Sequence, residues 1–229
     1  MTIDFDPVSF SGVIPIFPLP EIVLFPNMLL PLHIFEPRYL AMVEDALEGE
    51  QLIGMAMLEE GWESDYYGTP PIRERIGMGK IVNHEKIGDG RYNILLVGIY
   101  RVEIEELYSP DPYRRAKVRL LEEETGDATG DELQRLRDTL VDGYDQLRQL
   151  AGSVKAAEEI VRTNVPLGVL VDTLTSVMEL ASEQKQWLLE EEKVYERAVQ
   201  LSRLMAAQIR SMVSIKNRND FSPGDPRLN

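Results

Sequence analysis

The spacing of apolar residues changes once along the chain. Up to about residue 121, apolar residues alternate with polar ones or form short runs broken by proline and glycine, which is typical of β-strands. Beyond residue 131 they recur every three or four residues, as on one face of a helix. Between these parts, residues 122–131 are acidic, rich in small residues and without periodicity. This stretch predicts a domain boundary.

The first part predicts a small β-barrel with one helix. Pro37 and Gly49 bound the predicted helix. The sequence Gly88-Asp-Gly90 lies between two strand-like runs and predicts a hairpin of Ile76–Ile87 with Arg91–Leu107. Further extended segments are predicted at Val13–Phe17, Ile22–Phe25, Met28–Phe35, Leu52–Leu58 and Tyr113–Leu121. Six or more short strands favour a closed or half-closed barrel over residues 12–121.

The second part predicts a helical bundle over residues 131–215. Three long apolar stripes begin at Leu133, Leu167 and Val194, and shorter helices are expected at Val154–Val161 and Ser182–Leu189. The last stretch, 216–229, has three Asn, two Pro and one Gly, and predicts a disordered tail. The fold class is therefore α+β.

Composition excludes several kinds of partner and site. Lys and Arg number 24 against 39 Asp and Glu, a net charge of −15, which repels nucleic acid and anionic membrane. The chain has no cysteine, so a disulfide or thiolate chemistry is excluded. The acidic segment Met1–Asp6 differs from a secretory signal, and we expect the cytoplasm. Prolines between Val13 and Phe35 argue against a membrane helix there.

No catalytic, cofactor or metal site is predicted. The segment Gly77-Met-Gly79-Lys80 lacks the first glycine and the final Ser or Thr of a phosphate loop, and strand glycines explain it better. The two histidines, His33 and His84, have no ligand-spaced cluster around them. No serine lies in a glycine-rich nucleophile segment. We expect no enzymatic activity.

Several motifs, in order and spacing, resemble the N-terminal substrate-binding domain of Lon proteases. They lie within residues 12–121 and are Ile14-Pro-Ile-Phe-Pro-Leu19, Val23-Leu-Phe-Pro26, Leu30-Pro-Leu-His-Ile-Phe-Glu-Pro-Arg-Tyr39, Gly90-Arg-Tyr92, Gly98 with Arg101-Val102, and Pro112-Tyr113. Asn27 departs from the usual glycine, although Asn tolerates a left-handed backbone. The resemblance implies a PUA-like mixed pseudo-barrel followed by helices. It also implies a protein-binding module without the ATPase and protease parts of Lon.

Two groups of residues are candidates for binding polypeptide. The loop with Trp62, Tyr66 and Tyr67 offers aromatic anchors, although it is expected more often to fold back onto the barrel. Glu36, Arg38 and Tyr39 either fix the strand-to-helix corner or line a groove, and we favour the corner.

The leading hypothesis is a module that presents an apolar groove and an exposed strand edge to unfolded or extended polypeptide, for delivery to a protease or chaperone. One alternative is a barrel that binds or transforms a small ligand. Another is an RNA-binding module that uses Arg115, Lys117 and Arg119, unless Glu103 and Glu105 neutralise this row across the strands. The oligomeric state is left open.

Overall fold

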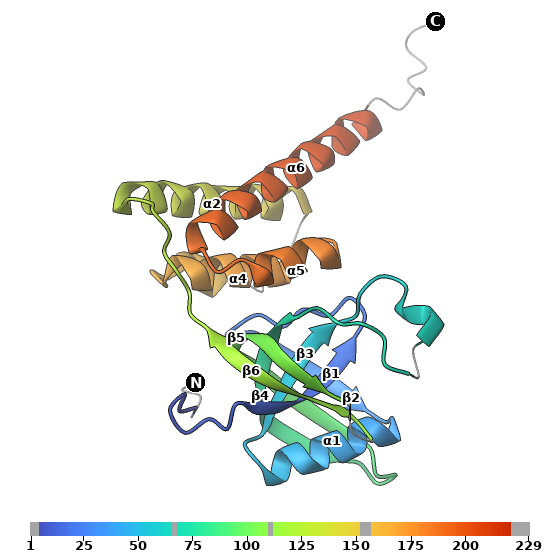
Figure 1. The fold of residues 1–229 in the computed structure, drawn as a ribbon. Coiled ribbons are helices and arrows are strands. Elements are labelled where there is room, and N and C mark those ends of the chain that lie inside the picture. The colour runs from blue at the N-terminus through green and yellow to red at the C-terminus, as the bar shows by residue number, and fades with distance from the viewer. Residues whose placement is uncertain (1–4, 66–67, 110–111, 152–156, 221–229) are drawn as a thin grey trace, which may run out of the picture. The chain divides into compact units, whose positions relative to one another are not determined.

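The computed structural model describes residues 5–65, 68–109, 112–151 and 157–220, whose elements divide into two units (Figure 1). Unit 1 comprises Met1–Glu123 with Glu179–Glu192, and unit 2 comprises Glu124–Met178 with Lys193–Asn229. The elements of unit 1 are β1 (Val13–Leu19), β2 (Leu29–Ile34), α1 (Pro37–Glu48), β3 (Leu52–Met57), the 3-10 helix η1 (Trp62–Asp65), β4 (Arg75–Lys86), β5 (Tyr92–Tyr108), β6 (Arg114–Leu121) and α5 (Ser182–Glu190). Those of unit 2 are α2 (Gly130–Ala151), α3 (Glu158–Arg162), α4 (Leu167–Val177) and α6 (Val194–Asp220).

The sheet of unit 1 closes through its longest strand. Its order is β2-β5-β4-β3-β1-β6, and β5 also pairs with β6. The first half of β5 pairs with β2, the second half with β6, and β4 follows β5 on its other edge. Strands β1 and β3 are parallel and the other pairs antiparallel. The predicted α+β class, with a mixed barrel-like sheet and a helical region, is confirmed.

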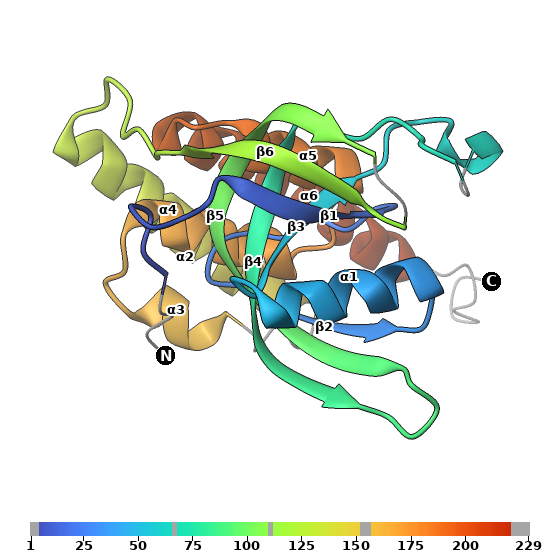
Figure 2. The ribbon, with the colours of Figure 1, turned by 60° about the horizontal axis from the view of Figure 1, so that its bottom comes forward.

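Two apolar clusters form the core of unit 1. In one, α1 covers the sheet (Figure 2). Its residues Tyr39, Met42 and Val43 pack on strand residues such as Phe17 and Ile94. The other cluster fills the opposite side of β1, β3 and β4. The Pro37 start and Gly49 end of α1 agree with the sequence prediction, as does the β4–β5 hairpin.

Three glycines let the segment between β1 and β2 lie directly on the sheet. A Cβ atom on Gly77 would lie 1.9 Å from the Leu24 carbonyl oxygen, and one on Gly98 would lie 2.0 Å from that of Phe25. A Cβ atom on Gly79 would lie 2.7 Å from a methyl carbon of the Leu24 side chain. The segment Ile22–Phe25, predicted as extended, is therefore not a strand of the sheet but a cover for it.

The same segment sets the start of β2. Asn27 has φ of 65°, the left-handed conformation expected of a residue in place of glycine. Its N–H donates to the Gly98 carbonyl (2.7 Å), and the Gly98 N–H donates to the Met28 carbonyl (2.9 Å). These two bonds fix where β2 begins against β5.

Helix α5 belongs to unit 1, although the sequence placed it within the 131–215 bundle. Buried Arg101 donates from Nε to the Leu189 carbonyl (3.0 Å), and Arg75 donates from Nη1 to that of Glu190 (2.7 Å). Gln186 donates in return to the Arg75 carbonyl (2.8 Å). Arginines thus satisfy carbonyls at the C-terminus of α5, which the helix itself cannot pair. The predicted domain limits themselves stay predictions.

Unit 2 packs around the first half of α6. Val194, Ala198, Leu201 and Met205 of α6 are buried, and α6 contacts α2 and α4. Fully buried Arg197 lies 3.8 Å from Asp172 of α4, measured from Nε to Oδ1. Helix α6 runs to Asp220, into the predicted tail, while 221–229 lie outside the described residues.

We expect Gly77→Ala and Gly98→Ala to destabilise the protein by at least about 3 kcal/mol, because the added methyl group meets backbone rather than a flexible side chain. Chemical denaturation followed by tryptophan fluorescence measures this. Gly88→Ala is the matched control, since nothing lies within 4 Å of its Cβ position. Equal stability of all three variants would contradict the close approach.

We expect Asp172→Ala to cost about 3–5 kcal/mol, because it removes a buried carboxylate that lies beside the buried Arg197 charge. Asp145→Ala removes a more exposed ion pair with Arg162 (2.6 Å) and should cost at most about 1 kcal/mol. Denaturation midpoints of the two variants that coincide would show that the buried pair is not required.

Candidate functional site

Strand β2 has a free edge. Among the strands that the structure describes, it pairs with β5 alone. Because Gly98 bonds to Met28, the hydrogen-bonded positions of this ladder are Met28 and every second residue after it. The backbone groups of Leu29, Pro31 and His33 therefore face away from β5. Pro31 has no N–H, so this edge offers two donors and three carbonyl acceptors.

The side chains beside this edge are apolar and accessible. Leu29 is 62% exposed and Phe35, just after the strand, is 61% exposed. His33 lies between them and is held in place: Nδ1 donates to Asn93 Oδ1 (2.7 Å), and Nε2 accepts from Arg91 (3.3 Å). Both ring nitrogens of the histidine are therefore occupied by hydrogen bonds within the protein. Figure 2 shows β2 at the border of the sheet. We call Leu29, Pro31, His33 and Phe35 the β2 edge.

The corner residues continue from the β2 edge into α1. Arg38 bonds through Nε to Glu36 (3.0 Å), and its guanidinium lies 4.6 Å from the centre of the Tyr39 ring. The Tyr39 ring packs 4.3 Å from Phe17 and is buried. Tyr39 is thus part of the core, in keeping with a corner role. Glu36 and Arg38 stay partly exposed, and their contact with polypeptide stays a prediction.

The aromatic loop is described only in part. Trp62 opens η1, is half-buried and packs against the second core cluster. It also lines a cavity of about 500 Å³ with Glu21, Glu60, Glu63 and Glu183. Tyr66 and Tyr67 lie outside the described residues. The described part therefore agrees with folding back onto the barrel, and binding by this loop stays a prediction.

The basic row of β6 is neutralised by its neighbours. Lys117 bonds to Glu105 (3.0 Å) and Arg119 to Glu103, both across the strand pair. Arg115 pairs with Asp45 of α1 (3.1 Å). The Arg119 guanidinium holds the pKa of the Glu103 carboxyl below its usual value. These three side chains therefore form no continuous basic face for RNA.

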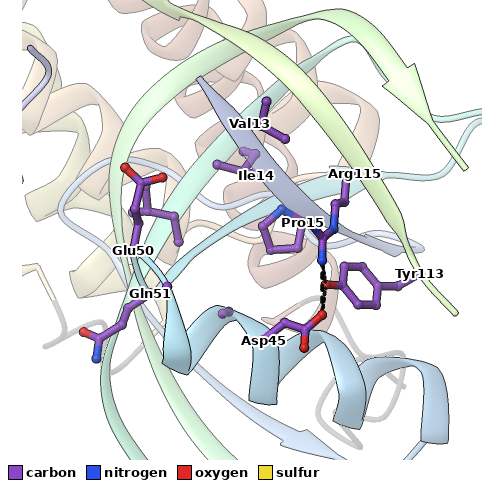
Figure 3. A pocket seen from close by; sticks show the side chains of 11 residues that line it. Val13, Ile14, Pro15, Asp45, Glu50, Gln51, Tyr113 and Arg115 are labelled. Atoms are coloured by element: carbon purple, nitrogen blue, oxygen red, sulfur yellow. Dashed lines mark hydrogen bonds and ion pairs between the residues drawn. The ribbon is translucent and has the colours of Figure 1, made fainter. Parts of the chain in front are cut away.

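A small cavity of about 200 Å³ lies where α1 ends beside β1 and β3 (Figure 3). The Tyr113 hydroxyl donates to Asp45, and Arg115 donates to the Tyr113 hydroxyl (2.5 Å). Burial raises the pKa of Tyr113, so this hydroxyl stays protonated at neutral pH. The polar groups bind one another, and none of these three is prepared as a general base.

The described ranges contain no metal cluster and no membrane-spanning helix. No group of three or more His, Asp or Glu there is placed to hold a metal ion. No described helix has both the length and the hydropathy to cross a membrane. Gly77 and Gly79 lie buried inside β4, so the segment that faintly resembled a phosphate loop is a strand.

Sequence reasoning missed Leu29 and Phe35. Both lie in a run of apolar residues, Met28–Phe35, in which inward and outward positions have similar hydropathy. One signal could have identified the outward face. Pro31 and His33 are less apolar than their neighbours and occupy every second position after Leu29, so these three residues lie on the same face of the strand. Proline is also typical of edge strands.

Comparison with known proteins supports one family. A model of the ATP-dependent protease La (LON) substrate-binding domain matches residues 13–207. The Lon protease of Dictyoglomus thermophilum is 29% identical over 90% of this chain, and that of Cytophaga hutchinsonii 27% over 93%. This chain spans about a quarter of each relative, 26% of its length.

Solved structures show the same fold. The N-terminal domain of the Mycobacterium avium complex Lon protease has a TM-score of 0.66 at 21% identity, covering 85% of this chain and 98% of that one. The Lon N-terminal domain protein from Xanthomonas campestris has a TM-score of 0.60 at 20% identity, covering 82% and 96%.

We expect Trp62→Ala to lower stability by about 1–2 kcal/mol, because the indole packs on the core. Thermal unfolding measures this, and exposed Glu63→Ala should change it little. An unchanged melting temperature in Trp62→Ala would show that the indole does not stabilise the fold. It would then favour a role of the loop in binding alone.

Proposed function

Because the chain belongs to the Lon substrate-binding domain family, we propose that it is a non-catalytic module that binds unfolded or extended polypeptide along the β2 edge. The observation that carries the proposal is a strand edge whose outward backbone groups pair with no other described strand, beside two exposed apolar side chains. An extended segment can add to such an edge through main-chain hydrogen bonds, while apolar contacts supply affinity. Neither contact requires a defined sequence.

The corner extends the proposed site by one charged pair. Glu36 and Arg38 follow Phe35 directly and keep part of their surface accessible. They offer a polar end to an otherwise apolar edge, where a bound segment leaves the sheet. We propose that Trp62 contributes only through the loop it supports. Delivery of the captured chain to a protease or chaperone in the cytoplasm belongs to the same proposal.

A small-ligand barrel is the weaker candidate. The cavity beside Tyr113 is about 200 Å³, below the usual size of ligand pockets. Its charged groups satisfy one another. The cavity beside Trp62 is larger, about 500 Å³, but four carboxylates line it, and these would repel an anionic ligand.

We expect the double variant Leu29→Ser with Phe35→Ser to lose affinity for fluorescently labelled casein by about thirtyfold, roughly 2 kcal/mol. Both side chains are exposed, so the melting temperature should not change. Val8→Ser is the control, because Val8 is 94% exposed and lies away from β2 in the sequence. Full casein binding by the double variant would reject the β2 edge as the site.

We expect the purified protein to leave casein and ATP intact over hours, since the chain offers no phosphate loop and no activated nucleophile. Gel electrophoresis and phosphate release measure this. Turnover that persists through repurification and disappears when one Ser or His is replaced would show that the chain is an enzyme.

A further inference from the structure

A groove of unit 1 lies beside the second half of β5, at the opposite end of this strand from the residues that pair with β2. Its volume is about 550 Å³. The lining comes from the loop between β3 and β4, the start of β4, the second half of β5 and the end of α5, all of which belong to unit 1. We call it the β5 groove.

Strand β5 has an unpaired edge beside this groove. Its pairing with β4 ends at Glu103, after which the Ile104 N–H donates to the Glu74 carbonyl (2.9 Å). Residues 106–108 then pair with β6 on one edge and with no described strand on the other. Alternate residues of a strand direct their N–H and C=O groups to each side. The end of β5 can therefore accept a further strand.

The groove also has apolar side chains that a bound segment could reach. Leu107 lines it and is 42% exposed. Ile104 is partly buried and packs against the second core cluster, and Pro71 is exposed in the wall. Because neighbouring strands lie about 4.8 Å apart, a side chain of a segment added to residues 106–108 would contact Leu107.

The charges of the groove are unbalanced. The two arginines that line it, Arg73 and Arg75, already bind carboxylates, at 2.5 Å and 3.2 Å respectively. Glu59 and Glu74 line it too, and neither forms an ion pair within the part of the chain that the structure describes. Glu74 is exposed and Glu59 partly exposed. The groove therefore keeps negative charge that attracts a basic group.

We propose that the β5 groove binds an extended polypeptide segment in which basic residues lie close to apolar ones. Main-chain hydrogen bonds form along residues 106–108, Leu107 supplies apolar contact, and Glu59 and Glu74 select for positive charge. This inference rests on the proposed capture of polypeptide and adds a second site to it, one that selects by charge. A small cation alone would use the carboxylates but not the strand edge.

Binding of short fluorescent peptides to the full chain, followed by anisotropy, tests the proposal. One peptide repeats two valines and two lysines, so that both faces of the extended chain carry each type. A second has glutamate in place of lysine, and a third is the lysine peptide with methylated backbone nitrogens. We expect the lysine peptide to bind at least about tenfold more tightly than either of the others, because the carboxylates repel glutamate and methylation removes the main-chain donors.

Substitutions locate this preference in the groove. Glu59→Gln with Glu74→Gln should weaken binding of the lysine peptide about tenfold and leave that of the glutamate peptide no weaker. Glu60→Gln with Glu63→Gln is the matched control, because it removes the same charge from exposed residues that do not line the groove. Leu107→Ser should weaken the lysine peptide to a similar extent, without a change in melting temperature.

The β2 edge variant separates this proposal from the proposed function. Leu29→Ser with Phe35→Ser should lower the affinity for casein and keep the preference for the lysine peptide. Persistence of that preference in Glu59→Gln with Glu74→Gln, or its equal loss in the control double variant, would overturn the β5 groove and leave the β2 edge standing. Tight binding of the methylated peptide would overturn strand addition. Unchanged casein binding in the β2 edge variant, with the peptide preference intact, would reject the β2 edge and support the groove.

Discussion

The contact of Leu24 and Phe25 with the glycines of β4 and β5 is the constraint on which the rest of unit 1 depends. At 1.9 and 2.0 Å from carbonyl oxygens, no side chain fits at Gly77 or Gly98. The segment held there places Leu24 and Phe25 in the interior and directs Asn27 and Met28 onto Gly98. That attachment fixes the register of β2, and a slip of one residue would exchange its inward and outward faces. The accessible edge therefore follows from glycines on other strands.

The sequence was informative where a single local pattern decides the structure. The hairpin at Gly88-Asp-Gly90 and the limits of α1 follow from turn residues and caps, which act over a few residues. Association of α5 with unit 1 does not follow from such patterns. An amphipathic helix shows that one face is buried but not which partner buries it. The decisive groups are Arg75 and Arg101, about 90–115 residues away in the chain, which bind carbonyls of α5.

The candidate site was predictable in kind but not in position. A strand edge and an apolar surface were expected, whereas the aromatic loop drew attention because aromatic residues dominate interfaces. In the structure Trp62 packs on the core and the Tyr39 ring packs at a tilt against Phe17. Leu29 and Phe35 are ordinary apolar residues in a proline-rich run, and their exposure depends on the register of β2. Such exposure is a tertiary property, which hydropathy along a sequence does not encode.

Charge bears on whether the proposed apolar edge would bind polypeptide in preference to other polymers. Most described arginines of the β unit are occupied: Arg119 pairs with Glu103, Arg115 with Asp45, and Arg101 with Glu123 and a helix end. Carboxylates outnumber them, so the surface repels phosphate backbones while the β2 edge itself carries little charge. The apolar residues of an unfolded chain would contact the β2 edge, and its basic residues would be attracted by the surrounding carboxylates. Nucleic acid would meet net repulsion, so the proposed site would discriminate between classes of polymer although it reads no defined sequence.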